Sequence, residues 1–149
     1  MTCESCRNPT SDSKIKVAEG ARSAIFRNSA RALYFRTRVD GCLLKNVTAA
    51  DFVVTCTGVG SVIVELKGVD VEHAVEQVDA TANYLKGCTA ADSILPLAGL
   101  VICSRYPRFD TKLQSITKKF VKRHKAPLHV VARNDEFDLD RVLAFDGPR

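Results

Sequence analysis

The sequence has no apolar run near the roughly 20 residues that a membrane-spanning helix needs. Its first segment, residues 1–7, lacks the apolar core of a secretory signal, so we expect a cytoplasmic protein. Internal repeats, low-complexity tracts and interdomain linkers are also missing. The length of 149 residues, with 46% apolar and 26% charged residues, therefore indicates one soluble domain with one hydrophobic core.

The six cysteines do not follow the pattern of a disulfide framework. The four that fall inside apolar stretches are Cys42, Cys56, Cys88 and Cys103. A buried free thiol is the usual state of such a residue, and no signal segment points to an oxidising compartment. We therefore expect no disulfide framework.

The polar N-terminal segment is expected to be a flexible arm over residues 1–12, followed by a single domain over residues 13–149. Within the arm, Cys3 and Cys6 have the spacing of half a zinc knuckle. No second cysteine pair or histidine pair stands near them, so the arm is preferred to a zinc site.

Hydrophobic periodicity and turn residues predict an alternation of helices and strands. Helices are expected over residues 13–28, 71–86 and 111–125, with a short one after Asp138. Strands are expected over residues 32–39, 51–56, 61–67, 95–104 and 128–132. This order predicts an α/β fold, a three-layer sandwich around a central mixed β-sheet.

Two of the predicted strands form a hairpin around Gly58-Val59-Gly60, a three-residue loop with glycine at its last position. This register places Asp51 opposite Lys67 and diagonal to Glu65. One-to-one pairing preserves the alternation of side chains, so all three share one face of the sheet. A two-residue loop would instead move Asp51 to the other face.

This grouping suits the hydrolysis of a phosphodiester bond. Two carboxylates, from Asp51 and Glu65, and the backbone carbonyl of Leu66 are oxygen ligands that bind Mg²⁺ or Mn²⁺. Such an ion neutralises a phosphate oxygen and lowers the pKa of a bound water, which Lys67 can orient. The alternative interpretation is a salt-bridged sheet edge.

At these residues the chain resembles the PD-(D/E)xK, or restriction-endonuclease-like, nuclease superfamily. The resemblance comprises Asp51, the motif Glu65-Leu66-Lys67 after a hairpin, and a following helix with Gln77, and its element order covers roughly residues 13–132. Some members carry a tyrosine about one helical turn after this glutamine, where the present sequence has Thr81.

The resemblance implies a restriction-endonuclease-like fold, metal binding by Asp51 and Glu65, and a catalytic role for Lys67. It also implies a further metal-binding acid on the first helix, for which Glu19 is the candidate, and a glutamine in the active site, which is Gln77. The alternatives are that Glu19 is an exposed helical acid and that Gln77 is a surface polar residue.

Positive charge is concentrated in the segment 112–125, which contains no acid, although the whole chain carries a net charge of only +5. The candidates for binding a nucleic-acid backbone are Lys112, Lys118, Lys119, Lys122 and Arg123. A second basic group comprises Arg22, Arg27, Arg31, Arg36 and Arg38. The alternative is that both groups only face solvent.

The leading hypothesis is therefore a metal-dependent endonuclease, expected to act on DNA in repair, restriction or defence. A second hypothesis is a nuclease-like fold that no longer cuts and serves as a binding or regulatory subunit. A third is a nucleic-acid-binding module that works through the basic helix alone. A homodimer is plausible for the enzyme, because cutting two strands takes two sites. Asp40 and His73 are further candidates for contact with the site or a phosphate.

Overall fold

The protein is described by a computed structural model that covers residues 5–66, 70–88, 95–105 and 110–149. The strands are β1 (Arg7–Thr10), β2 (Lys14–Glu19), β3 (Arg22–Arg27), β4 (Tyr34–Arg38), β5 (Phe52–Cys56), β6 (Gly60–Leu66), β7 (Leu97–Ile102), β8 (Leu128–Val131) and β9 (Asp135–Phe137). The helices are α1 (Val71–Lys86), α3 (Thr111–His124) and α4 (Leu139–Val142). The α/β class predicted from the sequence is confirmed.

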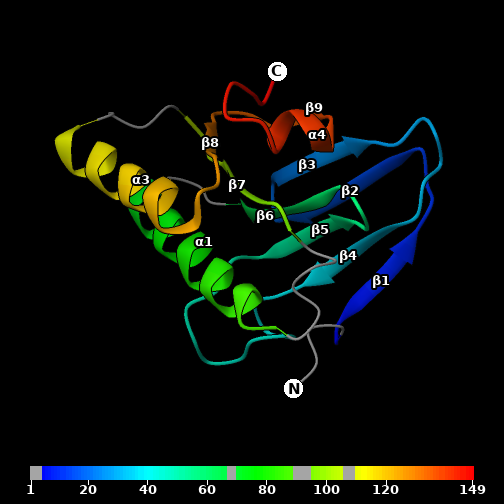
Figure 1. The fold of residues 1–149 in the computed structure, drawn as a ribbon, viewed down its shortest axis with the longest axis horizontal. Helices are drawn as coiled ribbons and strands as arrows, with labels where there is room; N and C mark the ends of the chain where they lie inside the picture. The colour runs from blue at the N-terminus through cyan, green and yellow to red at the C-terminus, as the bar shows by residue number, and fades with distance from the viewer. Residues whose placement is uncertain (1–4, 67–69, 89–94, 106–109) are drawn as a thin grey trace.

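The larger sheet is mixed, as expected. Its six strands lie in the order β1-β4-β5-β6-β7-β8. The first four pair antiparallel, whereas β6, β7 and β8 are parallel, with α1 and α3 as their crossover helices (Figure 1). The strand β6 at the centre is buried along its whole length.

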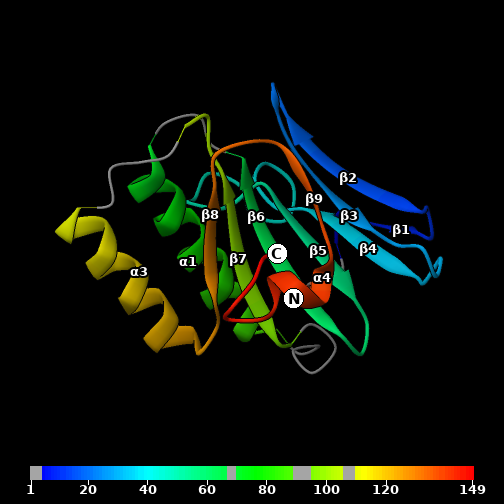
Figure 2. The same ribbon diagram turned by 90° about the horizontal axis from the view of Figure 1, so that it is seen from above.

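The two faces of this sheet are covered by different layers. Figure 2 shows α1 and α3 on one side, and the small sheet β2-β3-β9 with α4 on the other. Ile63 and Val53 point toward the helices and pack with Val78 of α1. Their neighbours point the opposite way, and Val62 packs in the cluster with Phe26 of β3. This alternation fixes which face each strand residue serves.

The helix expected over residues 13–28 is wrong, because this segment forms the hairpin β2–β3. Ile15 and Val17 are 1% exposed while Lys14 and Lys16 between them face solvent, which is the period of a strand. Gly20, with φ of +57°, forms the tight turn. Apolar residues here satisfied a helical spacing and a strand spacing together, and packing against the large sheet selected the strand.

The flexible arm expected over residues 1–12 is wrong for Arg7–Thr10, which form the edge strand β1 beside β4. The remaining predicted strands and helices agree with the structure within a few residues, including the short helix after Asp138.

Asp70 and Asp110 cap α1 and α3 by accepting hydrogen bonds from the backbone N–H of His73 and Leu113, at 3.0 and 2.9 Å. Among the described residues, no helix is long and apolar enough to cross a membrane.

The helices approach the sheet closely at Gly99 in β7. A methyl group built on Gly99 would lie 2.6 Å from Leu128 Cδ1 and 2.8 Å from Val78 Cγ1. Since Val78 belongs to α1, a side chain at position 99 would push this helix away from the sheet. The glycine therefore sets the spacing between α1 and the strands that it covers.

Candidate functional site

The β5–β6 hairpin turns one residue earlier than expected. Its strands pair Cys56 with Gly60 and Phe52 with Val64, so the loop consists of residues 57–59. Gly60 has φ of +150°, and a Cβ there would meet the Pro96 carbonyl oxygen at 2.6 Å, which explains glycine at this position. The pairing shifts by one residue on each strand, which keeps the alternation of faces. Extended by one residue, this register aligns Asp51 with Glu65, whereas the expected register placed Asp51 opposite Lys67.

Asp51 and Glu65 lie together on the helix-covered face of the large sheet. Asp51 is 7% and Glu65 2% exposed. Oδ2 of Asp51 accepts a hydrogen bond from the backbone N–H of Leu66 at 2.9 Å. The side chain of Glu65 lies close enough to affect the ionisation of Asp51.

Burial is the main cause that raises the pKa of Asp51 above its ordinary value. The Leu66 N–H and the side chain of Glu65 act in the opposite direction and lower this pKa, but burial prevails. A buried acid with a raised pKa beside a second acid is typical of functional sites, although structural pairs produce it as well. The arrangement therefore supports a site without assigning its chemistry.

The helix α1 fixes the segment that precedes Asp51. The hydroxyl oxygen of Thr81 accepts a hydrogen bond from the backbone N–H of Ala50 at 2.8 Å, and the side chain of Gln77 donates to the carbonyl of Ala49 at 3.1 Å. Gln77 is therefore half-buried and holds the backbone two residues before Asp51. The positioning role of Thr81 was missed by sequence reasoning, which treated this residue only as a departure from the nuclease pattern.

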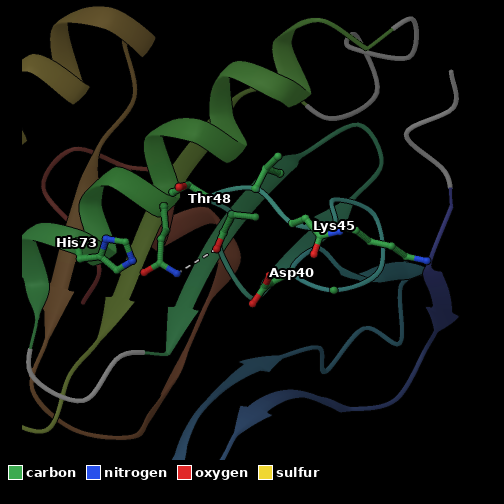
Figure 3. A pocket seen from close by; sticks show the side chains of 9 residues that line it. Asp40, Lys45, Thr48 and His73 are labelled. Carbon is green, nitrogen blue, oxygen red and sulfur yellow. Dashed lines mark hydrogen bonds between the residues drawn. The ribbon is translucent and has the colours of Figure 1, made fainter.

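An open cavity of about 730 Å³ adjoins this segment, between the loop 40–49 and the first turns of α1. Figure 3 shows His73 on the helix side of the cavity, with Asp40 and Lys45 on the loop side. Gln77 also lines it. A space of ligand size therefore adjoins the segment that leads into Asp51.

Glu19 is not where the resemblance places it. It ends β2, in the layer across the sheet from α1, and pairs with Arg38 at 2.7 Å. Its charge adds, after burial, to the raised pKa of Asp51, but its carboxylate is engaged in a half-exposed ion pair. The expected helical acid is therefore wrong, because the segment that carries it is a strand.

Lys67 lies outside the described residues, so its role remains a prediction. The backbone of Leu66, the expected third ligand, ends β6 next to the acid pair. Within the described part of the chain, no group of three or more histidine, cysteine, aspartate or glutamate residues gathers as a metal centre. A metal at this position would rest on two carboxylates and a carbonyl, with water or a phosphate completing its shell.

The basic helix α3 divides into paired and unpaired side chains. Lys112 binds Glu72 at 3.1 Å and Arg123 binds Asp79 at 2.7 Å, and both acids lie on α1. Three exposed lysines have no ion pair within the described residues: Lys118, Lys119 and Lys122. They line a shallow groove of about 350 Å³ along α3, together with hydroxyl side chains.

The cysteines differ from expectation. Cys56 and Cys103 are buried free thiols, as predicted. Cys42 is joined to Cys6 in a disulfide, and Cys88 is also disulfide-bonded, so the expectation for these two is wrong. The pairing of β1 with β4 brings Cys6 to the loop that follows β4, which no local spacing in the sequence reveals. Cys3 lies outside the described residues.

Comparisons with known protein families, with curated proteins and with solved structures found no match for this chain.

Proposed function

We propose that this protein is a metal-dependent nuclease whose site is built on Asp51 and Glu65. The observation that carries the proposal is the placement of two buried carboxyls at facing positions of neighbouring strands, next to a segment that lines an open cavity. A mixed sheet in which a hairpin is followed by the crossover helix α1 supports a restriction-endonuclease-like fold. The resemblance of the Glu65-Leu66-Lys67 motif points the same way.

The residues present fit one hard divalent cation, Mg²⁺ or Mn²⁺. Asp51 and Glu65 would hold it, with the carbonyl of Leu66 as a further oxygen ligand. Two buried carboxyls at neighbouring positions repel each other when both are ionised, so a positive charge between them is favourable. When bound, the ion would neutralise a phosphate oxygen and lower the pKa of a water. Lys67, the next residue along the chain, is proposed to orient that water.

Nucleic acid, with DNA as the preferred substrate, is the proposed partner. The groove along α3 presents Lys118, Lys119 and Lys122, whose charges are available for phosphate contacts. Lys112 and Arg123 are weaker candidates, because their charges are already matched by α1. A homodimer remains the proposed form for cutting both strands.

A second candidate is a nuclease-like protein that no longer cuts and acts as a binding or regulatory subunit. It is favoured by the low exposure of the pair, 7% for Asp51 and 2% for Glu65, which restricts access to a phosphate.

The disulfide between Cys6 and Cys42 bears on the compartment. Such bonds persist in oxidising environments and are rare in the cytoplasm, so it weighs against the cytoplasmic location that we expected.

Cleavage of labelled duplex and single-stranded DNA with Mg²⁺ or Mn²⁺ tests the proposal. We expect cleavage by the native protein, its loss with a chelator, and a loss of a hundredfold or more in Asp51→Asn. Asp12→Asn, an exposed acid away from the site, is the matched control and should cut normally. Binding without metal-dependent cleavage by the native protein would instead support the regulatory candidate.

A further inference from the structure

The cavity beside the acid pair is a preformed pocket, separate from the two carboxyls themselves. Its outer wall is the turn after β4, where the Gly41 N–H donates to the Leu44 carbonyl and the Leu44 N–H donates to the Val39 carbonyl, both at 2.9 Å. The disulfide of Cys42 with Cys6 holds the same turn to β1. Its inner wall is α1. Since both walls are fixed, a ligand would bind without first ordering the loop.

The acceptors of this pocket include one buried amide oxygen and one exposed carboxylate. The side-chain NH₂ of Gln77 is committed to the Ala49 carbonyl at 3.1 Å, which fixes the orientation of its amide. Oε1 of Gln77 is buried, and nothing in the described part of the chain donates to it. The carboxylate of Asp40, at the loop wall, is exposed to solvent and has no ion pair with any described residue. A buried acceptor without a donor costs about 1–3 kcal/mol, so this pocket favours a ligand that brings N–H groups.

The rest of the lining suits a flat, polar ligand. His73 presents an imidazole ring that is 43% exposed and held by Glu76 at 3.6 Å. Figure 3 shows this ring and Asp40 on different walls of the same pocket. A volume of about 730 Å³ falls within the usual range for small-ligand sites and exceeds what a lone ion occupies.

We propose that this pocket binds one unpaired nucleobase of the substrate strand, next to the phosphate at Asp51 and Glu65. The inference rests on the proposed nuclease function for its substrate class. The amino and ring N–H groups of a base would donate to Gln77 Oε1 and Asp40, and the base would stack on His73. In a duplex these groups are occupied by the complementary strand. The protein therefore selects substrates with an unpaired nucleotide, such as single strands, flaps and bulges, over fully paired duplexes.

Binding without cleavage isolates this pocket from the reaction. The probe is a single-stranded oligonucleotide carrying one 2-aminopurine, titrated with the protein in a chelator, beside the same oligonucleotide annealed to its complement. We expect a change in the fluorescence of the unpaired base and at least tenfold tighter binding of the single strand. Asp40→Ala and His73→Ala should each reduce that preference about tenfold. Asn83→Ala, an exposed residue further along α1, is the matched control and should leave it unchanged.

The outcomes separate the two proposals. If Asp40→Ala and His73→Ala bind the unpaired strand as tightly as the native protein, or if paired and unpaired strands bind alike, the base pocket is wrong whether or not the protein cuts. If the unpaired strand binds through Asp40 and His73 but no metal supports cleavage, the pocket stands and the nuclease proposal fails. Gln77→Met serves as a second pocket variant, because it keeps the length of the side chain and removes the acceptor.

Discussion

Removal of the disulfide between Cys6 and Cys42 should destabilise the protein strongly. The bond joins residues 36 apart in the chain. In the chain-entropy treatment a closed loop of this size removes roughly 13 cal/mol/K of entropy from the unfolded state, or about 4 kcal/mol at 25 °C. For a chain of this length, each kcal/mol corresponds to a melting temperature lower by about 2–4 °C, which gives a decrease of roughly 8–15 °C.

The assay is urea unfolding and thermal melting of Cys6→Ser, Cys42→Ser and the double variant, without reductant. All three should lose a similar free energy of unfolding, because each lacks the same bond. The loop that forms the outer wall of the pocket should also exchange its amide hydrogens faster, since Cys42 stands next to Gly41 of the pocket lining. A double variant within about 1 kcal/mol of the native protein would refute the reasoning.

Three further predictions follow from the fold and the surface. Gly99→Ala should lower the free energy of unfolding by about 1–3 kcal/mol, because the added methyl group overlaps α1 and β8; an unchanged urea midpoint would contradict this packing. Burial lowers the pKa of His124 and of His129 below 6.5, so the unfolded chain binds protons more readily. The free energy of unfolding should then fall as the pH decreases below about 6.5. This fall should be smaller in His124→Gln than in the native protein, and urea unfolding at several pH values measures both. Replacing Lys119 and Lys122 by Gln should make DNA binding less dependent on salt. The slope of the logarithm of the binding constant against the logarithm of the salt concentration should become less steep by roughly one to two. An unchanged slope would assign these lysines to solubility.

Strong local patterns in the sequence were sufficient for the part of the fold that carries the site. The apolar stripe of α1 has Asp70 at its start and Gly87 at its end, and the hairpin has glycines in its loop. These signals are local, so they predicted α1 and the β5–β6 pair within a residue or two. The one-residue error in the hairpin loop was harmless, because it kept Asp51 and Glu65 on one face.

The first segment failed because two periods fit the same residues. Ile15 and Ala18 suit one face of a helix, whereas Ile15 and Val17 suit one face of a strand. Only contact with the large sheet, through residues such as Phe26, decides between them. This error also misplaced Glu19, since its assignment depended on a helix.

Contacts between distant segments could not be predicted from one sequence. The pairing of Arg123 with Asp79 depends on α3 packing beside α1, and these residues are 44 positions apart. The Cys6–Cys42 bond likewise depends on β1 lying beside β4. The number of basic residues in α3 therefore overstated how many lysine and arginine side chains are available to bind a phosphate.

The most direct test of the account is the position of Mn²⁺ in a crystal soaked with this ion, read from its anomalous scattering. The account predicts one ion between the carboxyls of Asp51 and Glu65, with oxygen ligands at about 2.0–2.6 Å and the carbonyl of Leu66 among them. The same soak of Glu65→Gln should show no ion at this position. An ion bound elsewhere, or none in the native protein, would contradict the claim that these two acids form a metal site.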